Sequence, residues 1–425
     1  MLYDIREAQR AFLNPLSHWA DSMSQLYVNP YSPLAYVPFA NRISAGLELL
    51  HRLGKDYEKP GFGLHSTRVD GREVTVVERI EIARPFCRLV KFERLLPDAL
   101  AHRHRDDPVV LLFAPLSGHH ATLLRDTVQT LLPEHTVYVT DWIDARMVPL
   151  IEGNFELDDY VGYAIEFIRH LGPDVHVISV CQPTVPVLGA ISLMSSLDDP
   201  AVPRSMTMMG GPIDTRRSPT EVNNLAQTRS FEWFERTVIY RVPGRYPGAG
   251  RRVYPGFLQH AGFVAMNPDR HVTSHWDFYL SLVQGDMQDA DAHRRFYDEY
   301  NAVLDLPAEF YLDTIRTVFQ DHALPLGRWH VWFEGRRQRV APEDVRRVAL
   351  FTVEGELDDI SGQGQTKAAH ELCTGIPKSM KRHLTARGAG HYGIFSGRRW
   401  REFIYPQVRD FIASSRQRAK LRVVA

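Results

Sequence analysis

The sequence predicts an α/β protein with a mostly parallel sheet covered by helices on both faces. From Pro108 onward, short apolar runs alternate with segments of helical periodicity, as in strands joined by helical crossovers. The first run, 109–113, is continuously apolar, which is typical of a strand buried on both faces. The length of 425 residues exceeds what a single packed core usually holds, so we expect one large elaborated domain or two.

Six segments are expected to form the parallel part of this sheet. They are 109–113, 137–140, 175–180, 205–209, 348–353 and 381–384, with helices expected over 121–132, 160–171, from Thr184 onward and over 402–414. Two β-rich runs precede them, Val74–Val77 and Cys87–Phe92, joined across Arg84–Pro85. We expect these two runs to pair as antiparallel strands.

The chain is predicted to divide into three parts. Residues 1–70 form an N-terminal helical extension, because apolar residues recur near helical spacing over 43–57. Residues 71–213 and 343–425 form the α/β core. Residues 214–342 are rich in aromatic side chains at mostly helical spacing and hold too few strands to stand alone. They are therefore expected to interrupt the core as a largely helical lid or cap insert.

Composition and charge exclude several classes of protein. Lys and Arg total 50 against 51 Asp and Glu, a formal net charge of -1, and this balance lacks the basic surface of a dedicated nucleic-acid binder. The longest apolar run is about eight residues, far short of the roughly 20 that span a bilayer. The N-terminus has no apolar signal segment, and three cysteines fit a reducing compartment. We expect a soluble, cytoplasmic protein.

Cys181 stands at a predicted strand-to-helix turn, in the sequence Ser179-Val180-Cys181-Gln182-Pro183. This is the position of the serine in the nucleophile elbow G-x-S-x-G, with both glycines replaced. The replacements suit the turn, since Ser179 is small and Pro183 fits a first helical turn. A thiol beside a helix N-terminus is favoured as thiolate. We interpret Cys181 as a nucleophile, with a buried core cysteine as the alternative.

An acid and a histidine follow later predicted strands. Asp358 and Asp359 come after the strand at 348–353, where a buried acid can orient a histidine. We favour Asp358 because Ile360 is expected to turn inward, and the other aspartate is expected to cap the next helix. His391 follows the last strand between glycines that let the backbone approach other loops. The order nucleophile, acid, base is that of the α/β-hydrolase fold.

A fourth loop, residues 114–120, follows the first parallel strand. In the α/β-hydrolase fold this loop supplies one backbone N–H of the oxyanion hole, and the residue after the nucleophile supplies the other. We expect Leu116 or Ser117 to give the first and Gln182 the second. Ser117 is also a candidate nucleophile, but it lies in a loop and not at a strand-to-helix turn.

Other chemistries find little support. His102 and His104, like His119 and His120, lack a third ligand at metal spacing, and no HExxH is present, so no metal is expected. No glycine-rich phosphate-binding motif occurs, which argues against nucleotide chemistry. The segment 141–146 also follows a strand and is expected to hold an internal ion pair, with lining of the pocket as the alternative.

Several longer motifs surround these residues. They are Leu116–Asp126, Val180–Thr184, Glu354–Gly362 and Gly390–Gly397, together with Phe263–Arg270 in the insert. In these motifs, and over nearly the whole chain, the sequence resembles the intracellular polyhydroxybutyrate depolymerases. The resemblance implies a cysteine-type triad, which falls on Cys181, Asp358 and His391. It also implies poly(3-hydroxybutyrate) as substrate, the granule surface as partner and a granule-associated location in the cytoplasm.

The resemblance further implies a course of reaction. Cys181 attacks an ester carbonyl with His391 as base, and water releases 3-hydroxybutyrate or oligomers from the resulting thioester. Coenzyme A is an alternative acyl acceptor, and no other cofactor is expected. Two rival functions are a polyhydroxyalkanoate synthase-like acyltransferase and a non-catalytic granule-surface protein. The aromatic insert is expected to contact the polymer, and a homo-oligomer is left open.

Overall fold

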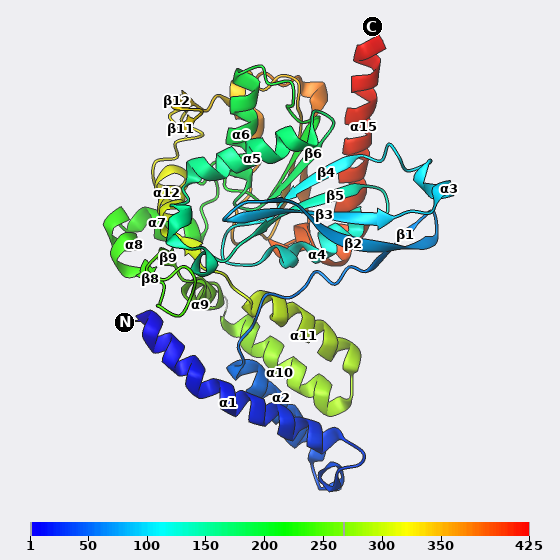
Figure 1. Ribbon diagram of the computed structural model, residues 1–425, viewed down its shortest axis with the longest axis vertical. Coiled ribbons are helices and arrows are strands. Elements are labelled where there is room, and N and C mark those ends of the chain that lie inside the picture. Colours follow the sequence, from blue (N-terminus) through cyan, green and yellow to red (C-terminus); the bar gives the residue numbers. More distant parts are fainter. Residues whose placement is uncertain (1, 267, 425) are drawn as a thin grey trace.

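The computed structural model describes residues 2–266 and 268–424; Met1, Ala425 and Asn267 of the insert motif lie outside the described residues. A nine-stranded sheet forms its centre, in the order β1-β2-β3-β5-β4-β6-β7-β13-β14 (Figure 1). The strands are β1 Ser66–Val69, β2 Arg72–Ala83, β3 Cys87–Leu95, β4 Val109–Phe113, β5 Thr136–Trp142, β6 His176–Val180, β7 Ser205–Met209, β13 Ala349–Gly355 and β14 Lys381–Ala386.

The sheet is mostly parallel. All neighbouring pairs from β5 through β14 are parallel. The pairs β1–β2, β2–β3 and β3–β5 are antiparallel. Strand β4 lies between β5 and β6, so successive crossovers run in opposite directions from it, as at the switch point of an open α/β sheet. The prediction of an α/β-hydrolase fold is confirmed, as is the antiparallel pairing of the two runs now seen as β2 and β3.

Helices cover both faces of the sheet. Helices α5 (Leu157–Leu171) and α6 (Thr184–Ser196) lie on one side, and α4 (Arg125–Leu131) and α15 (Tyr405–Val424) on the other (Figure 1). The helix expected over 121–132 begins with a tighter 3₁₀ turn at Ala121–Leu124, as is frequent at helix ends. Three short helices complete the core: α3 Asp98–Ala101, α13 Ala369–Leu372 and α14 Gly397–Arg399.

The N-terminal segment is a helical hairpin. Helix α1 (Leu2–Val28) and helix α2 (Ala40–Gly54) are joined through a 3₁₀ turn at Pro33–Tyr36. The predicted boundary at residue 70 needs correction, because β1 at 66–69 already pairs with β2 and belongs to the central sheet. Within the described ranges, no helix is long and apolar enough to cross a membrane.

The insert connects two neighbouring parallel strands, β7 and β13. Its elements are α7 Glu221–Thr228, α8 Phe231–Thr237, β8 Tyr240–Arg241, β9 Arg252–Tyr254, α9 Gly256–Met266, α10 Pro268–Gln284, α11 Met287–Asn301, β10 Leu306–Pro307, α12 Ala308–Thr314, a π-helix at Ile315–Gln320, β11 His330–Phe333 and β12 Arg336–Arg339. Helices α10 and α11 lie beside the N-terminal hairpin (Figure 1). Many insert aromatics are core residues, Phe278 and Tyr297 among them, while Trp276 is exposed.

Candidate active site

Cys181 occupies a strained turn between β6 and α6. Its φ is 66°, in the left-handed region that residues other than glycine rarely adopt. Two hydrogen bonds hold the turn: the Cys181 N–H donates to the Met209 carbonyl at 2.7 Å, and Thr184 Oγ1 donates to the Cys181 carbonyl at 2.9 Å. Strain of this kind persists where the surrounding structure enforces it, and it often marks a functional site.

Cys181 differs from the other two cysteines in its surroundings. Cys87 and Cys373 are buried in the core, and burial raises the pKa of the Cys373 thiol to about 12. Cys181 is only partly buried and sits at the edge of the same core. The core reading therefore describes Cys87 and Cys373, whereas Cys181 is the cysteine that a reactant can approach.

Two glycines that the sequence analysis did not single out make this turn possible. They follow β7, the strand beside β6. A Cβ atom on Gly211 would lie 1.8 Å from Thr184 Oγ1, and one on Gly210 would lie 3.3 Å from both Asp358 Oδ2 and His391 Cε1. The space around the turn is thus provided by the two glycines after β7. Ser179 and Pro183, which replace the usual elbow glycines, do not provide it.

Asp358 and His391 are joined by a direct hydrogen bond. His391 Nδ1 lies 2.8 Å from Asp358 Oδ2, and both side chains are buried. The other carboxylate oxygen, Oδ1, accepts the N–H groups of Ile360 at 2.9 Å and Ser361 at 2.8 Å, which fixes the carboxylate plane. Of the two adjacent aspartates, Asp358 is therefore the one bonded to the histidine, while Asp359 is exposed.

The pKa of His391 depends on both the Asp358 carboxylate and the Cys181 sulfur. Burial by itself would lower the pKa of His391, but the Asp358 carboxylate and the Cys181 sulfur, which is hydrogen-bonded to the ring, raise that pKa well above its ordinary value. The ring is thus held in its charged form between a carboxylate and a sulfur. Three residues far apart in sequence, each following a strand, meet at one end of the sheet.

The loop at 114–120 borders this site and is fixed by the insert. Gly118 has a φ of 109°, and a Cβ atom there would lie 2.6 Å from Gln259 Oε1 of α9, so only glycine fits. Its carbonyl accepts the Leu304 N–H at 2.8 Å. Among the described residues, the backbone N–H groups of Leu116 and Ser117 make no hydrogen bond to the protein. They remain available as donors.

Gln182, the residue after Cys181, contributes two kinds of polar group. Its backbone N–H has no protein partner within the described part of the chain. Its side chain is buried, and neither the amide oxygen nor the amide nitrogen finds a partner among the residues that the structure describes. Burying an amide without hydrogen-bond partners costs free energy of folding. Packing alone therefore does not explain a glutamine at this position.

His119 lies close to the same site. Burial, the nearby His260 and the charge of His391 lower its pKa to about 4, although its Nε2 contacts the Tyr300 carbonyl at 3.2 Å. His119 is therefore neutral at physiological pH. Across 2–266 and 268–424, no group of three or more His, Cys, Asp or Glu side chains is arranged to hold a metal ion.

A cluster of buried charges beside the site holds the N-terminal helix. Asp144 pairs with Arg146 at 2.9 Å, within the segment expected to carry an internal ion pair. Tyr3 donates to Asp305 at 2.7 Å, and the Asp305 N–H donates to Asp144 Oδ1 at 3.2 Å. Burial and the neighbouring Asp305 raise the pKa of Asp144 to about 7, despite Arg146.

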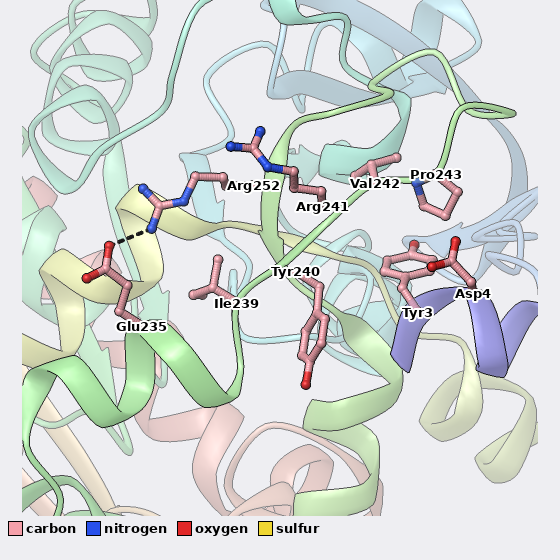
Figure 2. A pocket seen from close by; sticks show the side chains of 9 residues that line it. All are labelled: Tyr3, Asp4, Glu235, Ile239, Tyr240, Arg241, Val242, Pro243 and Arg252. Atoms are coloured by element: carbon pink, nitrogen blue, oxygen red, sulfur yellow. Dashed lines mark hydrogen bonds and ion pairs between the residues drawn. The ribbon is translucent and has the colours of Figure 1, made fainter. Parts of the chain in front are cut away.

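A surface hollow lies near this cluster and away from Cys181. Figure 2 shows it between the start of α1 and strands β8 and β9, and its volume is about 520 Å³. Arg241 and Arg252 reach its wall, and Arg252 is paired with Glu235 at 2.7 Å. None of the three residues joined at His391 lines it, so the hollow is separate from the candidate active site.

Part of the chain matches a known protein family. Residues 210–416 match the family model described as PHB de-polymerase C-terminus. Over these residues the chain matches the PHB depolymerase family. The matched region carries Asp358 and His391, while Cys181 precedes it. This match supports ester hydrolysis as the activity. A comparison with curated proteins finds no match.

Solved structures of several hydrolases are similar to this chain at low identity. One is the monoacylglycerol lipase of Paleococcus ferrophilus, with 13% identity and a TM-score of 0.42, covering 72% of this chain and 94% of the lipase. Another comes from work on carboxylesterases of the thaumarchaeon Nitrososphaera gargenis, with 12% identity and a TM-score of 0.41, covering 83% of this chain and 99% of that chain. The fold assignment itself rests on the strand order and connectivity of the chain.

Proposed function

We propose that this protein cleaves ester bonds of poly(3-hydroxybutyrate) with Cys181 as nucleophile, His391 as acid and base, and Asp358 as the residue that orients His391. The observation that carries the proposal is the position of the His391 ring, hydrogen-bonded to Asp358 on one side and to Cys181 on the other. This is the arrangement of a nucleophile, a base and an orienting acid.

The raised pKa of His391 defines the resting state of the proposed reaction. In the proposed reaction the imidazole carries the proton, and Cys181 reacts beside it as thiolate. The thiolate attacks the ester carbonyl carbon, and the carbonyl oxygen takes up the negative charge. Collapse of this intermediate breaks the carbon–oxygen bond, and His391 gives its proton to the departing alcohol oxygen. A thioester on Cys181 remains.

Backbone N–H groups stabilise the oxyanion in this proposal. Gln182 supplies one, and Leu116 or Ser117 supplies the other, since these groups make no hydrogen bond to described residues. In the second half of the reaction, His391 takes a proton from water, hydroxide adds to the thioester, and the carbon–sulfur bond breaks. Thiolate is restored, and 3-hydroxybutyrate or an oligomer leaves.

Coenzyme A is a second candidate acceptor. A thioester exchanges readily with another thiol, so coenzyme A in place of water would yield the CoA thioester of the product. We propose no other cofactor. The enzyme would act at the granule surface in the cytoplasm, with exposed insert side chains such as Trp276 contacting polymer. Replacing Trp276 by Ser should weaken adsorption to granules, and unchanged adsorption would argue against that contact.

The decisive experiment measures product release from native amorphous poly(3-hydroxybutyrate) granules, with and without coenzyme A. Wild type is compared with Cys181→Ala, and Cys373→Ala serves as the matched control because that thiol is buried. Loss of release only in Cys181→Ala supports the proposal. Release that requires coenzyme A indicates thiolysis, whereas unchanged release by Cys181→Ala excludes the cysteine mechanism.

The same experiment separates the rival functions. A synthase-like acyltransferase would incorporate 3-hydroxybutyryl-CoA into polymer. A non-catalytic granule protein would bind granules and release nothing. The Asp358–His391 bond at 2.8 Å argues against the passive protein, since binding polymer alone requires no buried carboxylate–imidazole pair.

A further inference from the structure

The N-terminal hairpin buries its small polar face and leaves its apolar face in solvent. Helix α1 packs on α2 through Ser17 and Ser24, and Ser24 Oγ lies 3.0 Å from Ser44 Oγ. Most large apolar side chains of α1 point outward instead: Phe12 is 77% exposed and Trp19 is 53% exposed. Because burial of apolar surface drives folding and association, a helix pair with this distribution lacks a partner.

Most of the exposed apolar side chains of α1 follow a heptad repeat. At alternating steps of three and four stand Leu2, Ile5, Gln9, Phe12, Leu16, Trp19, Met23 and Leu26. All but Gln9 are apolar, and none is charged. Apolar residues that repeat every 3.5 residues form the seam along which one helix packs on another in a coiled coil. On a straight helix this seam drifts around the axis by about 20° per heptad. It therefore matches a partner helix that coils around α1 better than a flat surface.

Helix α2, together with its N-cap residue Phe39, carries a second seam of the same kind. Phe39, Ile43, Gly46, Leu50 and Leu53 are spaced by four, three, four and three, and all five are exposed. Gly46 lies in the helix, and a Cβ atom there would meet nothing within 4 Å. The fold of one chain does not require this glycine, which costs about 1 kcal/mol relative to alanine. It leaves a gap in the seam for a large side chain from outside.

The two seams lie on the same side of the hairpin. Ser17 of α1 contacts His51, and Ser24 contacts Ser44, so the helices are antiparallel. Viewed from its own N-terminus, each helix carries its seam roughly 120° anticlockwise of this contact line. Because the second helix runs in the opposite direction, the same rotation brings both seams to one side. Together they form a single mainly apolar face, here called the hairpin face, with no charge at the seam positions and the Arg42 guanidinium over the ring of Phe39.

The opposite side of the hairpin is the one attached to the rest of the chain. Glu48 of α2 accepts from Arg294 at 2.7 Å, and Arg52 donates to Asp298 at 2.9 Å, both partners belonging to α11. The hairpin face therefore points away from the insert and the sheet. The C-terminal end of α15 lies at the far end of the molecule (Figure 1).

We propose that the hairpin face is a dimer interface, in which two copies of this chain pack their hairpins around a two-fold axis as an antiparallel four-helix bundle. A two-fold contact needs a self-complementary face, and two seams with heptad period and no charge meet that need. Ten exposed apolar seam side chains offer area on the order of the 800 Å² per partner that a stable interface buries. The proposal concerns assembly and does not depend on the proposed chemistry.

The test measures the mass of the full chain by light scattering after gel filtration, over a range of concentrations. Wild type is expected at twice the mass of one chain. Phe12→Glu with Trp19→Glu should give a monomer, because each copy would place two charges in the apolar contact. The matched control, Ala11→Glu with His18→Glu, has the same spacing on exposed positions of α1 outside the seam and should remain dimeric.

Circular dichroism and ester hydrolysis on a soluble substrate show whether the variants are folded. If the α1 variant fails to fold, Leu50→Glu in α2 provides the same test from the other helix. A wild-type monomer at every concentration overturns the proposal whatever the variants do. So does a seam variant that stays dimeric. A monomeric wild type whose adsorption to amorphous polyester particles is lost in the seam variants would assign the hairpin face to the polymer surface instead.

Discussion

Asp358 accepts a 2.8 Å hydrogen bond from His391 with one carboxylate oxygen, while its other oxygen is held by two backbone N–H groups. The carboxylate is thereby oriented before any substrate arrives, and it keeps the charge on His391. Burial opposes that charge, so the pKa of His391 depends on Asp358 and Cys181 together. Asp358 is thus best described as the residue that positions and charges the ring.

Replacing Asp358 by Asn should reduce kcat/KM on the order of 10³- to 10⁴-fold, because the ring loses its orientation and its charge partner. In wild type the pKa of His391 lies well above 6.5, so kcat/KM should show no histidine inflection near pH 6.5. In the variant burial dominates, and the inflection should move down. A pH–rate profile of both proteins checks this, and identical profiles would contradict the assignment.

The same shift predicts a sign for stability. A histidine whose pKa is raised on folding stabilises the folded state fully below its unfolded pKa of about 6.5, and this contribution is lost as pH rises through the folded value. The difference in free energy of unfolding between wild type and His391→Gln should therefore shrink at alkaline pH. Urea denaturation at several pH values measures it.

Gly211→Ala should destabilise the fold, because the new Cβ atom would overlap Thr184 at the Cys181 turn. The expected loss is about 1–3 kcal/mol, as for other overpacked sites. Gly162→Ala is the matched control: this glycine lies in α5 with nothing within 4 Å of a Cβ atom, and alanine there should stabilise by up to about 1 kcal/mol. Thermal denaturation distinguishes the two, and equal melting temperatures would refute the packing argument.

Asp144 should make stability fall as pH rises. Its pKa is about 7 in the folded protein and about 3.8 in the unfolded chain, so the folded state holds a proton that the unfolded state releases between these values. Asp144→Asn cannot titrate. Its free energy of unfolding should therefore improve relative to wild type as pH rises from about 4 to 7. A constant difference across this range would mean that Asp144 is charged in the fold.

Gln182→Met tests the unpaired buried amide. Both polar atoms of the side chain lack partners among the described residues, so removing them should leave stability unchanged or raise it by about 1–3 kcal/mol. If the amide binds substrate, KM should rise while the melting temperature holds. A clear loss of stability would show that the amide has a structural partner instead.

The sequence by itself determined the strands, the turn and the order of the three site residues. Apolar runs such as 109–113 and 205–209 are local signals, and the structure forms strands at both. The place of Cys181 between a strand and a helix is likewise a local property of 176–184. The sequence favoured Asp358 over Asp359 only through the expected direction of Ile360. Two adjacent aspartates offer the same chemical group, and the hydrogen bond to His391 shows which of them meets the ring.

Only the tertiary structure decided which groups meet. Gly210 and Gly211 matter because β7 lies beside β6, a pairing that no local pattern encodes. The charge on His391 arises from contacts with Asp358, 33 positions earlier in the chain, and Cys181, 210 positions earlier. The exposure of Phe12 and Trp19 depends on which face of α1 packs on α2. Periodicity shows that a helix has an apolar stripe, whereas through-space packing determines what that stripe contacts.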